Sequence, residues 1–119
     1  MDLTYFDKMA LSEFTSLEKQ SLYQLLCGAM IVDGNRDSRE IALINEVNKV
    51  MYITVADVED SRKLTESQMV SVLRGMDKLK KAYAAKFMAQ VILADGVVTQ
   101  KEEKFFLYMK ERLDLPDID

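Results

Sequence analysis

Two segments of this chain each contain an Asp-Gly pair followed by a glutamate, and a further aspartate lies inside the first segment. Carboxylate oxygens at this spacing can hold a hard divalent cation such as Mg²⁺, Ca²⁺ or Mn²⁺, the only class of cofactor that the sequence suggests. The chain has one cysteine and no histidine, which excludes zinc sites built from those ligands. The candidate metal ligands are therefore Asp33, Asp37, Glu40, Asp95 and Glu102.

The spacing resembles that of an EF-hand loop, but the surrounding residues do not fit one. If Gly34 takes the sixth position of the loop and Glu40 the twelfth, positions 1 and 3 fall on Ala29 and Ile31, which cannot coordinate calcium. No histidine is available as a base for a serine or the cysteine, and no glycine-rich loop is present to bind phosphate. We expect no enzymatic activity and no catalytic residues.

Structural roles compete with metal binding at each candidate ligand. Glu40 and Glu102 each follow a capping side chain by three residues, where a glutamate can accept a hydrogen bond from the backbone at the start of a helix. Asp33 and Asp95 come at the ends of helices, where the helix dipole disfavours negative charge. Either an Asx turn or a bound cation would compensate, and the residues alone leave both explanations open.

Helical periodicity dominates the chain and positions these segments at junctions between helices. Seven helices are predicted, and no segment has the alternation of a strand. Hydroxyl or aspartate side chains begin most of them, and the glycine of each Asp-Gly pair is expected to turn the chain through positive φ. The helices run from about Leu3 to Leu11, Thr15 to Val32, Asp37 to Met51, Thr54 onward, Thr65 to Gly75, Asp77 to Ala94, and Thr99 to just before Pro116.

The chain contains an internal repeat, because its two halves match when residue numbers are offset by 62. The Asp-Gly pairs coincide, the glutamates coincide, and the apolar positions agree in class. We therefore predict an all-α, single-domain bundle of about six to seven helices over residues 1–119, with repeat units at about 15–53 and 77–115 and an internal pseudo-two-fold axis.

Composition indicates the type of partner. The net charge is −4, which argues against nucleic-acid binding by neutralisation of phosphates and favours a protein partner or self-association. We interpret Lys78, Lys80, Lys81 and Lys86 as the solvated side of one helix. The apolar runs are too short for a membrane span, and the start has no signal-peptide pattern, so a cytoplasmic location is expected.

The repeated motif resembles that of the tellurite-resistance protein B (TerB-like) family. The segment 93–102 is the closer copy, and segment 31–40 is the looser one because Val32 replaces a small residue before the aspartate. The resemblance covers about residues 15–115. It implies an α-helical domain with pseudo-two-fold symmetry and acidic loops that engage divalent metal, with Asp33, Asp37, Glu40, Asp95 and Glu102 as ligands. Such domains appear in stress-response systems and in DnaJ-type co-chaperones.

Two functions follow from these observations. The first is a non-enzymatic interaction module of the TerB-like, stress-response type, which binds a partner protein or its own copy. The lack of catalytic groups supports it, as do eight methionines that can form an adaptable surface. The alternative is a weak divalent-metal-binding domain that uses the two acidic loops.

Overall fold

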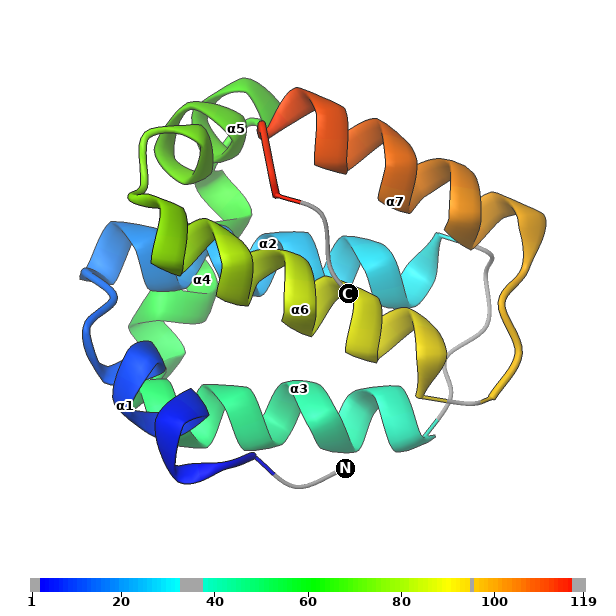
Figure 1. Cartoon of the computed structure of the whole chain (residues 1–119). Coiled ribbons are helices and arrows are strands. Elements are labelled where there is room, and N and C mark those ends of the chain that lie inside the picture. The colour runs from blue at the N-terminus through cyan, green and yellow to red at the C-terminus, as the bar shows by residue number, and fades with distance from the viewer. Residues whose placement is uncertain (1–2, 33–37, 95, 117–119) are drawn as a thin grey trace.

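The computed structural model describes residues 3–32, 38–94 and 96–116, and within these ranges the chain forms seven α-helices and no strand. The prediction of an all-α helical bundle is confirmed (Figure 1). The helices are α1 (Tyr5–Ser12), α2 (Ser16–Ile31), α3 (Ser38–Met51), α4 (Val55–Lys63), α5 (Glu66–Arg74), α6 (Lys78–Leu93) and α7 (Gln100–Arg112).

Local capping chemistry sets where the helices begin. Threonine at the N-cap and an acidic or amide side chain three residues later form reciprocal hydrogen bonds in α2, α4, α5 and α7, as the sequence predicts. A further box of this kind, Thr4 with Asp7, opens α1 and was not expected. The cap predicted for α3 involves Asp37, which lies outside the described residues.

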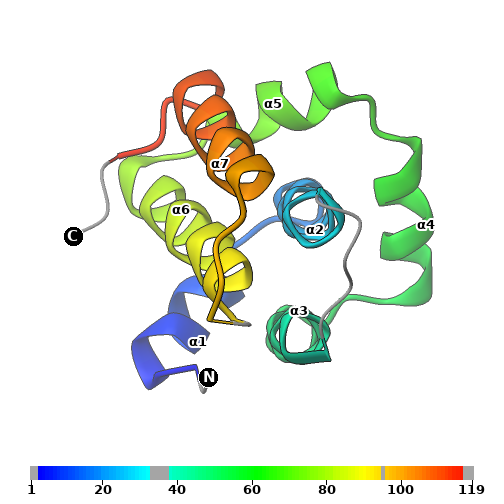
Figure 2. The ribbon, with the colours of Figure 1, turned by 90° about the vertical axis from the view of Figure 1, so that its right-hand side faces the viewer.

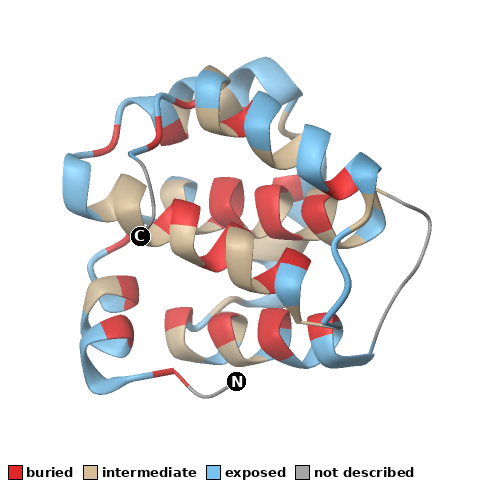
Figure 3. Cartoon of the chain, turned by 45° about the vertical axis from the view of Figure 1, so that its right-hand side comes forward, coloured by how far each residue is buried: buried red, intermediate tan, exposed pale blue. Residues whose placement is uncertain are grey.

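Helices α2 and α6 form the centre of the bundle, where they run side by side in the same direction (Figures 1 and 2). Their inward side chains are large and fully buried, as Leu22 and Phe87 illustrate. Helices α3 and α7 return along opposite sides of this pair, and buried residues line the surfaces where the helices meet (Figure 3). One continuous apolar core joins all four helices.

The structure places the two halves in matching positions, and the match includes α1 and α5 as well as the helices that follow them. At the end of α3, Tyr52 has a φ of 57°, and the backbone N–H of Ile53 donates to the carbonyl of Asn48 at 3.0 Å. At the end of α7, Asp114 has a φ of 55°, and Leu115 donates to the corresponding carbonyl five residues earlier at 2.9 Å. The same local fold therefore closes both units.

The lysines of α6 are less solvated than we interpreted them to be. Lys80 forms an ion pair of 2.8 Å with Glu18, and both side chains are largely buried. These two residues are equivalent positions of the repeat, 62 residues apart, so the pair joins α2 and α6 between matching positions of the two halves. Lys86 pairs with Asp7 of α1 at 2.6 Å, and Lys81 approaches Asp114 at 3.6 Å.

Helix α1 also differs from expectation in which side it buries. The sequence pattern predicts an apolar, inward side formed by Tyr5, Phe6, Met9 and Ala10, but Tyr5, Phe6 and Met9 are exposed. Leu11 and Asp7 are buried instead. The reason is tertiary: α1 lies against α3 and α6, where the buried Asp7 carboxylate pairs with the half-exposed Lys86 of α6.

Candidate functional site

The second Asp-Gly segment is described from Gly96 onward, and its local geometry follows the sequence closely. Gly96 has a φ of +80°, a conformation that glycine adopts without steric cost. Thr99 then caps α7: its hydroxyl accepts from the backbone of Glu102 at 3.1 Å, and the Glu102 carboxylate accepts from the backbone of Thr99 at 3.0 Å. The capping role predicted for Glu102 is therefore present.

Capping accounts for only one of the two oxygens of Glu102. The residue is 1% exposed, and its Oε2 is buried with no hydrogen-bond partner within the described part of the chain. A buried carboxylate oxygen without a donor costs free energy, so this atom marks a place where a ligand or a loop group can be accommodated. Glu40, at the matching position of α3, is 2% exposed.

Asp33, Asp37 and Asp95, the remaining candidate ligands, lie outside the described residues. Among the residues that are described, no three aspartate, glutamate, cysteine or histidine side chains lie close enough together to hold a metal ion. The structure therefore brings Glu40 and Glu102 into the interior at the starts of α3 and α7, and it leaves their relation to the three aspartates unassigned.

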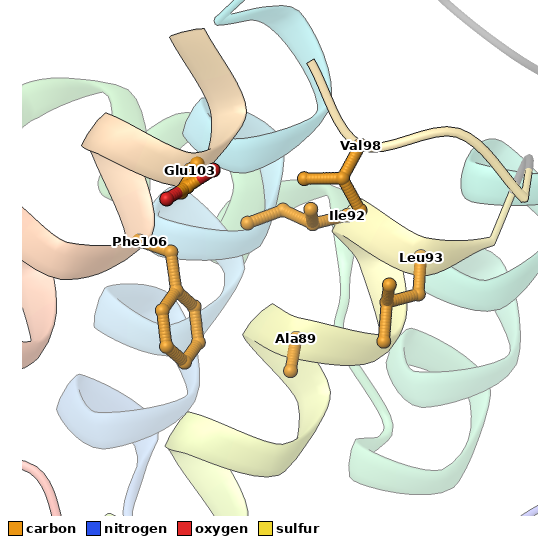
Figure 4. A pocket seen from close by; sticks show the side chains of 6 residues that line it. All are labelled: Ala89, Ile92, Leu93, Val98, Glu103 and Phe106. Atoms are coloured by element: carbon orange, nitrogen blue, oxygen red, sulfur yellow. The ribbon is translucent and has the colours of Figure 1, made fainter. Parts of the chain in front are cut away.

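An apolar pocket that the motif did not predict lies beside the second Asp-Gly segment (Figure 4). It opens between the end of α6, the segment that follows and the first turns of α7. Its volume is about 200 Å³, enough for one or two apolar side chains of a partner. The lining residues are Ala89, Ile92, Leu93, Val98, Glu103 and Phe106.

Exposed apolar side chains extend this pocket onto the surface. Leu93 is 55% exposed and Val97 and Val98 are also exposed, so three large apolar side chains face solvent within six residues. Among the described residues, Glu103 is the only charged one in the lining. This arrangement can hold an apolar group beside a basic one. Helical periodicity does not predict this pocket, because it depends on how α6 and α7 pack against each other.

Asp7 forms contacts that hold α1 against α6. Burial tends to raise the pKa of this carboxyl, but hydrogen bonds from Lys86 and from the backbone and hydroxyl of Thr4 outweigh burial, so the pKa lies below its ordinary value. Glu18 behaves in the same way: burial opposes ionisation, and hydrogen bonds from Lys80 and Thr15 overcome it and lower the pKa. Both carboxylates are thus held ionised by contacts between helices.

No helix in the described part of the chain combines the length and the apolar character that crossing a membrane requires.

Comparison with known proteins bears on the fold alone. No protein-family model matches the sequence, and neither does any curated protein. Among solved structures, the chain is similar to a protein of unknown function from Porphyromonas gingivalis W83, with a TM-score of 0.68 and 19% sequence identity. The similarity covers 88% of this chain and 83% of that one. At this identity the similarity supports the all-α fold and gives no information about activity.

Proposed function

We propose that this chain is a non-enzymatic interaction module of the TerB-like class, of the kind found in stress-response systems, and that it acts by binding a partner protein. The observation that supports this most strongly is the apolar pocket beside the second Asp-Gly segment, with exposed Leu93 and Val98 in its lining. A cytoplasmic location is part of the proposal, because one cysteine cannot form an intrachain disulfide.

The pocket favours a partner that inserts an apolar side chain. Among the described residues its walls are apolar except for Glu103, so a leucine or phenylalanine flanked by a lysine or arginine has complementary shape and charge. Filling the pocket with such a side chain stabilises a complex by about 2 kcal/mol through apolar burial. That is enough to make Leu93 a residue whose replacement weakens binding strongly.

The internal repeat supplies a matched control for a binding experiment. Ile31 is the counterpart of Leu93 in the first unit, with 47% of its surface exposed against 55% for Leu93. Glutamate at either position places one new charge at the end of a central helix. Only Leu93→Glu, however, places it in the pocket.

The experiment immobilises the full chain as wild type, Leu93→Glu and Ile31→Glu, and compares the proteins each retains from lysate of the source organism. A protein retained by wild type and Ile31→Glu is then purified, and its affinity is measured by calorimetry. We expect Leu93→Glu to weaken its binding at least about tenfold. Equal binding by all three variants, or an equal loss for Ile31→Glu, would remove the pocket as the docking site.

Weak binding of Mg²⁺, Ca²⁺ or Mn²⁺ is a second candidate function, favoured by the buried Oε2 of Glu102, which has no hydrogen-bond partner among the described residues. A carboxylate oxygen in that position suits a cation that water and a neighbouring acidic side chain also ligate. The ligand set inferred from the sequence, Asp33, Asp37, Glu40, Asp95 and Glu102, would then divide between two sites of few protein donors each.

Titration with each cation, followed by backbone amide shifts, tests this second candidate. Metal binding predicts shifts confined to residues 33–40 and 95–102 that disappear in Asp33→Ala and Asp95→Ala. The variant Glu102→Gln, which keeps the side-chain volume and can still accept from Thr99, should also lose the shifts of the second segment. The absence of any shift at millimolar metal would refute it.

A further inference from the structure

The two repeat units differ in what covers the outer flank of their central helices. On the first unit, α4 packs along α2, where the side-chain amide of Gln20 donates to the Asp57 carboxylate at 3.0 Å and that of Gln24 donates to the Leu64 carbonyl at 2.8 Å. On the second unit, none of the described residues forms a helix over the corresponding flank of α6. Figure 2 shows α4 to the right of α2 and no counterpart to the left of α6.

The backbone defines where a counterpart of α4 would lie. The chain leaves α7 through Asp114 and Leu115 with the same positive φ and the same hydrogen bond by which it leaves α3 before entering α4. Figure 2 shows the chain after α7 running to the side of α6 that faces away from α2. A helix placed like α4 would lie over Ala82 and Lys86, the counterparts of Gln20 and Gln24.

Beside that path lies a depression between α1 and the first half of α6. Its lining residues are Phe6, Met9, Ala10, Glu13, Leu79 and Tyr83. Phe6 is 71% exposed and Met9 is 50% exposed. The matching positions of α5 are Gln68 and Ser71, which are polar and exposed, so this fold does not require apolar residues at these positions. The apolar side chains on α1 consequently suit a contact that α5 does not make.

The charge of the depression indicates which helix fits. Glu13 and Asp77 border it, and no ion pair among the described residues involves either carboxylate. Lys80 also borders it, but this lysine is already neutralised by Glu18 at 2.8 Å. The depression is therefore apolar at its centre and negative at its edge. A second copy of the chain would bring the same two carboxylates toward each other, which disfavours self-association through this face.

We propose that the depression between α1 and α6 binds an amphipathic helix of a partner protein, with an apolar stripe on Phe6, Met9 and Leu79 and basic residues facing Glu13 and Asp77. The bound helix lies along α1 and the first half of α6. This surface is distinct from the pocket beside Leu93, and each can be tested without the other.

Two synthetic helical peptides of about 16 residues, a length at which isolated helices become measurable, serve as probes. They share one leucine stripe and carry either lysine or glutamate at the flanking positions. Each is titrated into the full chain while amide shifts and affinity are recorded. The variants are Met9→Glu in the depression and Ser71→Glu at the matching position of α5; both positions are exposed, so neither substitution disturbs the core.

The proposal expects the lysine peptide to bind with shifts on α1 and α6, at least about tenfold more tightly than the glutamate peptide. It expects Met9→Glu to weaken binding about tenfold or more and Ser71→Glu to leave it unchanged. Absence of binding, equal affinity for both peptides, or shifts centred on α2 and α4 would overturn it. Concentration-dependent dimers that Met9→Glu dissociates would also overturn it, in favour of a second copy as the occupant. Loss of partner binding in Leu93→Glu tests the other pocket alone.

Discussion

Replacing Lys86 by methionine should destabilise the protein more than replacing Asp7 by asparagine, although the two residues form one ion pair. The Asp7 carboxylate is 3% exposed and lies 2.6 Å from the Lys86 ammonium, whose side chain is 36% exposed. Methionine preserves the apolar stem of the lysine and removes its charge. The carboxylate then remains buried and keeps the hydrogen bond that it accepts from the backbone N–H of Thr4.

The magnitudes follow from what each variant leaves behind. An ionised carboxylate left without its cation costs about 3–5 kcal/mol when fully buried, and water access on the lysine side reduces this to about 2 kcal/mol. Asp7→Asn keeps the shape and can still accept from Thr4, so it costs about 1 kcal/mol. The double variant should cost less than the sum of its parts, because it leaves no buried charge, with a coupling of about 1 kcal/mol.

Urea unfolding at neutral pH, followed by circular dichroism, measures all four members of this cycle. Thermal unfolding gives a second measure of the same variants. At about 4 °C per kcal/mol for a chain of this size, Lys86→Met should lower Tm by about 8 °C. Lys78→Met, at an exposed position on the same helix, should change stability by less than about 0.5 kcal/mol. If Lys86→Met matched this control, or if the coupling in the cycle were below about 0.3 kcal/mol, the ion pair would not anchor α1.

Three shorter predictions concern pH and the second Asp-Gly segment. The folded pKa values of Asp7 and Glu18 lie below their ordinary values of 3.8 and 4.5, so the stability these carboxylates contribute is present above those values and is lost as pH falls below them. Unfolding between pH 5 and 2.5 should therefore be less pH-dependent in Asp7→Asn than in wild type. Gly96→Ala should lower the free energy of unfolding, measured in urea, by about 1 kcal/mol. The positive φ alone accounts for this, because a Cβ there meets no atom of the described residues within 4 Å. Thr99→Ala should cost about 1 kcal/mol through loss of the cap of α7, with faster amide exchange in its first turn.

Local chemistry is the part of this fold that could be predicted from sequence. A threonine followed three residues later by glutamate satisfies donors within one turn, so Thr15 and Thr99 mark helix starts wherever the helices later pack. The positive φ of Gly96 is equally local, because it depends on the helix ending there. The repeat is visible for the same reason: equivalent positions need the same residue types to form the same elements.

What only the tertiary structure decided is which faces of those helices meet. The order of the helices does not say that Asp7 lies against Lys86, so the apolar side of α1 was assigned inward when it faces solvent. Lys80 and Glu18 were placed on separate helices by the sequence, and the side-by-side packing of α2 and α6 brings them together. Burial depends on neighbours distant in the chain, and helical periodicity carries no information about them. The sequence by itself therefore determined the helices, their caps and the repeat. The packing of those helices decided which carboxylates are buried and which apolar side chains stay exposed.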